Sequence, residues 1–229
     1  MSMRRLLLVS SSVVAIVCAL APAPLDARVT DSGVLERFLR QEGEPLRAFI
    51  ARRTLEASTR GGKMSGLLEA WTRLDSPGRF TFEITREEGS SLIRNRVLRK
   101  ALETEQSSHA KKGKGEAELT SANYIFGPVA PAASGVASVS IHPHVKDPMR
   151  FNGTLDLNMS TAELVRLSGE LSDTPSWWTR HVDIEQRYQR LSGVNVPVEF
   201  RSRADVRVVG ESTFRMTYEY ESVNGRPVH

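Results

Sequence analysis

The chain has 229 residues, with 31 Lys or Arg against 27 Asp or Glu and a formal net charge of +4 at pH 7. The cationic and anionic residues are interspersed, so the composition does not indicate a nucleic-acid-binding protein. The single cysteine, Cys18, lies in a segment that we expect to be removed. We therefore expect a mature protein without disulfide bonds or thiol chemistry.

The N-terminus has the layout of a secretory signal peptide. Arg4 and Arg5 precede an apolar run over residues 6–20, and small residues and prolines follow. The run is short for a membrane span, which makes an uncleaved anchor the less favoured alternative. We predict a signal peptide over residues 1–27, cleaved after Ala27, and a single exported domain over residues 28–229 located in the periplasm.

The first half of the mature chain mixes helices and strands. Asp31 or Ser32 can cap a short helix that Gly43 ends. Alternating apolar residues then predict strands near residues 49–57, 68–74 and 80–84. The apolar pairs of GSSLIRNRVLRKALETEQ, spaced four or five apart, predict an inserted helix. Flexible loops are expected over residues 105–121 and 127–138, which are polar or rich in glycine and proline.

The second half reads almost entirely as strands. In FNGTLDLNMSTAELVRLSGEL, residues 151–171, apolar and polar residues alternate as in a hairpin with one apolar face. Similar alternation recurs over residues 182–188, 194–208 and 214–220, and we count roughly nine to eleven strands. The predicted fold class is mainly β (α+β): a strongly curved antiparallel sheet that forms a half-open β-barrel, with the N-terminal helix and the inserted helix covering its concave face.

The apolar side chains of this concave face are the candidate lipid-binding residues. Burial of acyl methylenes against them is favourable, although a face packed solid by its own side chains would have the same sequence pattern. The candidates are Phe80, Phe82, Val97, Phe151, Leu155, Leu157, Val182, Ile184, Val198, Phe200, Phe214 and Met216.

Catalytic and metal-binding signals are weak. His142 and His144 lie two residues apart, a spacing that could place two imidazoles on one side of a strand. The interpretation as loop histidines beside Pro143 is favoured, because the chain has only five histidines. No GxSxG, HExxH, P-loop or GxGxxG motif occurs. We predict no catalytic residue, no metal and no cofactor.

Trp177 and Trp178 in SWWTR are candidate interface residues. Adjacent residues of a strand face opposite ways, so if one tryptophan packs inward the other turns toward water, lipid or a partner. Packing of both on an irregular segment after Pro175 is the alternative.

The strand series that contains KDPMRFNGTLDLN, SWWTRHVDIEQRY and GVNVPVEF, after an N-terminal and an inserted helix, resembles the outer membrane lipoprotein-sorting proteins of the LolA-like superfamily. That superfamily (LolA, LppX and RseB among its members) also includes lipid carriers and envelope-stress sensors. The resemblance covers most of residues 31–224 and implies an unclosed barrel with helices at its open side. It implies acyl chains in an apolar hollow as ligands.

Three hypotheses for function follow. The first is a noncatalytic, monomeric carrier of lipid acyl chains or acylated lipoprotein in the bacterial envelope, which envelope membrane proteins could also contact. The second is a noncatalytic sensor or scaffold module on the same fold, with a filled core. The third is an enzyme with a site at His142 and His144.

Overall fold

The structure is a computed structural model, and it describes residues 26–40, 43–75, 78–110, 119–132, 135–147, 150–173, 179–207 and 210–228. The predicted signal peptide lies outside the described residues, apart from Asp26 and Ala27 at the start of the first helix. Among the residues described, no helix has both the length and the apolar character to cross a membrane.

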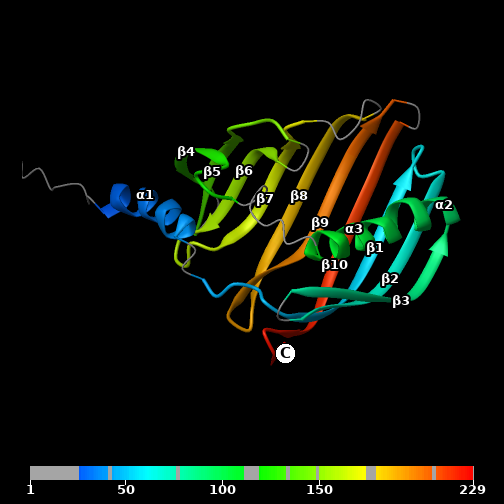
Figure 1. Cartoon of the computed structure of the whole chain (residues 1–229). Coiled ribbons are helices and arrows are strands. Elements are labelled where there is room, and N and C mark those ends of the chain that lie inside the picture. Colours follow the sequence, from blue (N-terminus) through cyan, green and yellow to red (C-terminus); the bar gives the residue numbers. More distant parts are fainter. Residues whose placement is uncertain are drawn as a thin grey trace, which may run out of the picture.

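The described residues form one antiparallel sheet of 11 strands, in the order β3-β2-β1-β10-β9-β8-β7-β6-β5-β4, with β11 paired to β10 (Figure 1). The ends of this order, β3 and β4, do not pair with each other, so the sheet is open. The strands are β1 (Phe49–Thr59), β2 (Met64–Asp75), β3 (Arg79–Gly89), β4 (Tyr124–Pro131), β5 (Val136–Pro143), β6 (Phe151–Asn158), β7 (Leu164–Leu171), β8 (Thr179–Leu191), β9 (Val194–Val206), β10 (Gly210–Val223) and β11 (Arg226–Pro227).

Helices pack against one face of this sheet, which we call the helix face; the opposite one is the open face. Helix α1 (Asp26–Leu39) packs on β4 and β6. The inserted helix, as predicted, is one continuous element: α2 (Ser91–Ile93), a π-helical turn η1 (Arg94–Leu98) and α3 (Arg99–Ala110), and it packs on β1, β2 and β3. Figure 1 shows the two helical elements over opposite ends of the sheet. The predicted fold class is confirmed.

Alternation along the strands divides the side chains between the two faces. Ala57 on β1 pairs with Phe214 on β10, and Phe214 pairs with Ser202 on β9, so these three share the helix face. Glu56 and Arg215 pair one position away and share the open face. Because a strand has a side-chain period of two, the register of one pair determines the facing of every residue until a bulge intervenes.

Two apolar clusters form on the helix face, one under each helix. The first cluster lies under the inserted helix and contains Phe49, Leu55, Leu68, Phe80, Ile93, Leu98, Leu102, Val194 and Val196 among its buried residues. The second cluster lies under α1 and contains Val34, Tyr124, Val139, Ile141, Phe151, Leu155, Leu157, Leu164 and Leu167. The core is therefore divided, and strands β8 to β10 connect its two parts.

A pair of glycines permits a close approach between β6 and β7. Gly153 and Gly169 are register partners. A Cβ on Gly153 would lie 2.1 Å from the Ser168 carbonyl oxygen, and one on Gly169 would lie 2.0 Å from the Asn152 carbonyl oxygen. Only glycine fits such a contact, because any side chain would force the strands apart.

The two predicted flexible loops are partly wrong. Helix α3 continues to Ala110 inside the expected loop 105–121, because Gln106 donates to the Phe80 carbonyl oxygen at 3.3 Å and His109 stacks on the Phe80 ring. Much of 127–138 is strand. A bulge between Phe126 and Val129 keeps Pro128 off the ladder of edge strand β4, where proline is tolerated.

The hairpin of residues 151–171 is confirmed, but its second strand faces differently than expected. A bulge between Asp156 and Leu157 makes Leu157 the partner of Leu164. Leu164 is therefore buried, whereas Val165, which the alternation placed on the apolar face, is half-buried.

Candidate functional site

A strip of partly exposed apolar side chains lies on the helix face between the two clusters. We call it the central strip and define it by six of the predicted lipid-binding residues: Val182, Ile184, Val198, Phe200, Phe214 and Met216. The strip joins the clusters, because Val198, Phe214 and Met216 pack against the first cluster and Ile184 against the second. Phe200 stands between them, opposite Met216 and with its ring centroid 6.0 Å from that of Phe214.

Five other predicted residues lie within the clusters themselves. Phe80 belongs to the first cluster, and Phe82 packs against it half-buried. Phe151, Leu155 and Leu157 are buried in the second. Since these four buried side chains already contact protein atoms, a ligand would reach them only after the covering helix had moved.

Ion pairs fix how the inserted helix lies on the sheet. On one flank, Arg94 and Arg99 reach Glu87 of β3 at 3.3 and 2.8 Å. On the other flank, Glu105 reaches Arg53 of β1 at 2.5 Å. The helix therefore has one flank toward the edge strand β3 and the other toward β1 and its neighbour β10.

Val97, the remaining predicted residue, lies on the flank toward β1. Arg94 and Arg99, which face β3, directly follow the buried residues Ile93 and Leu98 in sequence. Leu92 and Val97 directly precede Ile93 and Leu98 and so face the opposite way. Leu92 is 55% exposed and Val97 37%. Their flank presents partly exposed apolar surface on the side of the helix toward β1.

Arg53 is a buried cation that the sequence analysis missed. Its side chain is 2% exposed, and it donates two hydrogen bonds to Glu105, at 2.5 and 3.0 Å. Its guanidinium lies 4.6 Å from the centroid of the Tyr218 ring. Burial lowers the pKa of Arg53, but the hydrogen bond and charge of Glu105 outweigh it, so the net shift is upward. A signal was present, because Arg53 interrupts the apolar alternation of Ala51 and Leu55.

Three tyrosines also lie near the strip. Burial raises the pKa of Tyr218 to about 12 and raises the pKa values of Tyr188 and Tyr220 further. Tyr220 donates to the Pro197 carbonyl oxygen at 2.8 Å. Their hydroxyls favour the neutral form, so they add hydrogen-bonding groups without charge.

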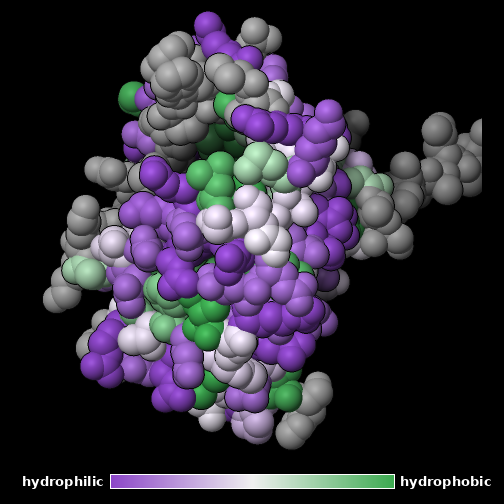
Figure 2. Space-filling view, turned by 90° about the vertical axis from the view of Figure 1, so that its right-hand side faces the viewer, coloured by the Kyte–Doolittle hydropathy of each residue, from purple (hydrophilic) through white to green (hydrophobic). Residues whose placement is uncertain are grey.

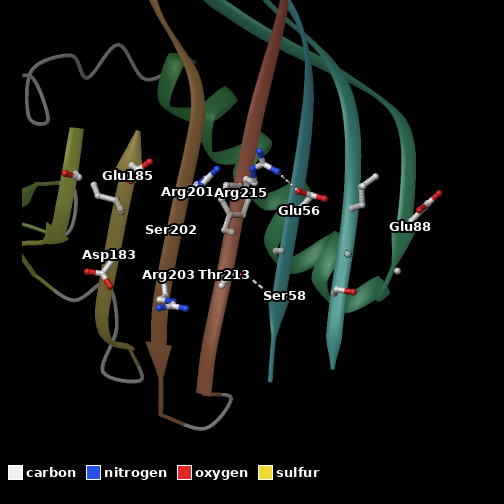
Figure 3. Close-up of a pocket in the computed structure, with 18 of the residues that line it drawn as sticks. Glu56, Ser58, Glu88, Asp183, Glu185, Arg201, Ser202, Arg203, Thr213 and Arg215 are labelled. Carbon is white, nitrogen blue, oxygen red and sulfur yellow. Dashed lines mark hydrogen bonds and ion pairs between the residues drawn. The ribbon is translucent and has the colours of Figure 1, made fainter. Parts of the chain in front are cut away.

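A hollow lies on the open face, where no site was predicted from the sequence. It is a groove of about 1190 Å³. Figure 3 shows the helices behind the sheet and two rows of side chains in front: Glu185, Arg201, Arg215 and Glu56 in one row, and Asp183, Arg203, Thr213 and Ser58 in the other. The strand backbone between the rows forms its floor, from Gly169 on β7 to Gly89 on β3.

Two arginines that line this groove, Arg201 and Arg215, contact a buried carboxylate that lies outside its lining. One oxygen of Glu199, whose side chain is 12% exposed, lies 2.7 Å from Arg215 Nε and 2.9 Å from Arg201 Nη2. Burial alone would raise the pKa of Glu199, but the hydrogen bonds from Arg215 and Arg201 outweigh it and hold the pKa below its ordinary value. The two guanidiniums are half-exposed, at 49% each.

The two candidate metal-binding histidines do not converge. His142 Nδ1 lies 3.4 Å from Asn152 Oδ1, whereas His144 Nε2 lies 3.1 Å from the Ser121 carbonyl oxygen. Both side chains are exposed. Within the described part of the chain, no group of three or more His, Cys, Asp or Glu side chains is placed to hold a metal ion.

The predicted interface residues Trp177 and Trp178 lie outside the described residues.

Figure 2 shows the side of the molecule at β3 as mostly hydrophilic, with small separate hydrophobic patches.

The chain is similar to known proteins in structure only. No family model and no curated protein sequence matches the chain. Among solved structures, a LolA superfamily protein from Nitrosomonas europaea is 9% identical, with a TM-score of 0.40 over 82% of this chain and 91% of that one. A DUF1329 family protein from Desulfovibrio piger is 9% identical, with a TM-score of 0.42 over 83% and 91%. MucB is 10% identical, with a TM-score of 0.24 over 84% and 93%.

The first of these proteins bears the name of the superfamily that the sequence resembles. At identities near one tenth and TM-scores below 0.5, function has to be argued from this chain's own residues.

Proposed function

We propose that the protein is a noncatalytic binding protein that holds an acyl chain, of a lipid or of an acylated protein, along the central strip. The observation that carries the proposal is the exposure of the strip. Six apolar side chains predicted to line a lipid site share one face of the sheet, and all six are partly exposed between two clusters that are buried.

The energetics of such a complex are sufficient. Each acyl methylene removed from water contributes about 0.8 kcal/mol. A chain of about fourteen carbons would gain on the order of 10 kcal/mol before the cost of ordering it, and about 8 kcal/mol corresponds to micromolar binding. Apolar lining on two sides, from the strip and from the Val97 flank of the inserted helix, would shield more of the chain than a flat sheet could.

The cellular role in this proposal is transfer within the bacterial envelope. The apolar run after Arg4 and Arg5 supports export to the periplasm, with cleavage after Ala27. An acyl chain exposed to water would otherwise aggregate or insert into the nearest membrane, so a monomeric carrier of this kind would move acylated cargo between envelope membrane proteins.

The proposal is tested by looking for the ligand and then blocking its site. Organic extraction of the purified mature protein followed by mass spectrometry should recover phospholipid or fatty acid, and a fluorescent fatty acid should bind and be displaced by it. Ser202→Trp places a large ring in the strip, between Ile184 and Phe214, and should weaken fatty-acid binding by about tenfold or more. Thr81→Trp, at an exposed open-face position on β3, is the matched control and should bind normally.

The opposite results would end the proposal. If gentle preparations contain no lipid and no fluorescent fatty acid binds, or if Ser202→Trp and Thr81→Trp bind it equally well, the central strip is not a lipid site. The second hypothesis, a partner-binding module on the same fold, would then stand in its place.

A further inference from the structure

Two arginines at the centre of the open-face groove are placed directly opposite each other. Arg201 on β9 and Arg215 on β10 are register partners. Like charges in this position repel and destabilise a sheet. Both guanidiniums are nevertheless held in place, because one oxygen of the buried Glu199 accepts from each, at 2.9 and 2.7 Å.

The carboxylate between them leaves most of their hydrogen-bonding capacity unused. A guanidinium has five N–H donors, and Glu199 engages Nη2 of Arg201 and Nε of Arg215. Arg215 Nη1 lies 3.7 Å from Glu56 Oε2, beyond hydrogen-bonding distance. The two arginines and Glu199 together carry one net positive charge, and Glu56, 49% exposed at the rim, is the nearest further anion to Arg215.

Acids elsewhere along the groove have side-chain partners of their own. Glu185 pairs with Arg187 at 2.7 Å, and Asp183 with His181 at 2.8 Å. Glu88 pairs with Arg86 at 2.6 Å. These contacts draw the three carboxylates toward groups outside the groove's lining, whereas Arg201 and Arg215 belong to the lining and lie side by side in one of its rows (Figure 3).

We propose that Arg201 and Arg215, oriented by Glu199, bind a phosphoryl group in the open-face groove, supplied by a soluble phosphate compound or by a phospholipid headgroup. Arginine forks match the oxygens of a phosphate, and a buried carboxylate that holds two of them in position reduces the ordering cost of binding. The groove opens on the face opposite to the central strip, although Ile184 and Phe214 belong to the strip and also line the groove. The phosphoryl site does not rest on acyl-chain binding.

Inorganic phosphate is the first probe, titrated calorimetrically into the full-length mature protein at constant ionic strength. Binding should saturate, and Arg201→Gln and Arg215→Gln should each weaken it by about tenfold or more, since each removes charged hydrogen bonds. Glu56→Gln should tighten it several-fold because it removes the competing anion at the rim. Arg52→Gln is the matched control, because Arg52 lies on the same face, is 45% exposed and forms a similar ion pair with Glu219 at 3.1 Å.

A second arm identifies the source of the phosphoryl group. Flotation with phosphatidic acid vesicles but not with phosphatidylcholine vesicles, lost in Arg201→Gln and kept in Arg52→Gln, supports the headgroup. Saturable phosphate binding without flotation supports a soluble compound. The proposal is overturned if neither phosphate nor phosphatidic acid vesicles bind to the wild type or to Glu56→Gln. It is also overturned if Arg201→Gln and Arg215→Gln bind phosphate and the vesicles as well as Arg52→Gln does. Tighter binding by Glu56→Gln cannot result from misfolding, which keeps the test decisive.

Discussion

Removal of Glu105 tests whether the buried ion pair holds the inserted helix on the sheet. In Glu105→Ala the guanidinium of Arg53, 2% exposed, loses its carboxylate and remains among the rings of Phe49, Phe80 and Tyr218. Burial, which alone lowers the pKa of Arg53, then acts without the compensation that Glu105 provides.

The expected loss in free energy of unfolding for Glu105→Ala follows from the burial of Arg53 and Glu105. Loss of one partner from a fully buried pair costs about 3–5 kcal/mol. Glu105 is 30% exposed, so water can partly replace it and we expect about 2–3 kcal/mol. For a domain of this size each kcal/mol lowers Tm by about 2–4 °C. Arg53→Met, which leaves only the part-exposed carboxylate, should cost less than Glu105→Ala.

Urea and thermal unfolding of the mature protein measure these differences. Glu103→Ala is the control, because Glu103 lies on the same helix and pairs with the exposed Lys100 at 3.5 Å. Surface pairs of this kind contribute less than about 1 kcal/mol. The reasoning is refuted if Glu105→Ala is no more destabilising than Glu103→Ala. It is also refuted if Arg53→Met lowers the free energy of unfolding more than Glu105→Ala does.

Three further predictions follow from single residues. The pKa of Glu199 is lowered in the folded state, so its contribution to stability is present at neutral pH and lost as pH falls below about 4; urea midpoints should fall less steeply there in Glu199→Gln. The pKa of Tyr218 is raised by burial to about 12, so stability should fall as pH rises from about 10 toward 12, and Tyr218→Phe should reduce the fall in urea midpoint between pH 8 and pH 11. Gly153→Ala should lower Tm by several degrees because its Cβ would meet backbone at 2.1 Å, whereas Gly33→Ala, in a helix with open space around it, should raise Tm slightly; equal effects would contradict the close approach.

The apolar face of the sheet could be predicted residue by residue. Phe214 and Met216 alternate with Arg215 and Thr217, and a strand has to place them on opposite faces whatever surrounds it. The same alternation over residues 182–188 and 194–200 predicted which side chains share the central strip. The inserted helix was predictable for the corresponding reason, because its apolar pairs recur at helical spacing.

Bulges and long-range contacts defeated the same reasoning elsewhere. The bulge at Asp156 places Leu164, instead of the expected Val165, on the buried side of the sheet. Nothing in the local alternation indicates that the strand contains one extra residue. Helix α3 runs into an expected loop because Phe80, on a strand some thirty residues earlier, offers a ring and a carbonyl oxygen to it.

The open-face groove was not predictable from one strand at a time. Arg215 lies between Phe214 and Met216, and Arg201 lies between Phe200 and Ser202, so each arginine by itself indicates only a solvated face. Their juxtaposition above Glu199 depends on the register between β9 and β10.

The sequence by itself determined most element types, the two-faced character of the sheet and, where no bulge intervenes, the membership of each face, because these follow from the backbone period of a few neighbouring residues. Only the tertiary structure decided which apolar residues are sealed beneath helices and which stay exposed, and which charges meet across strands. Those outcomes depend on strand register and on ion pairs such as Arg53 with Glu105, between residues that are far apart in the chain.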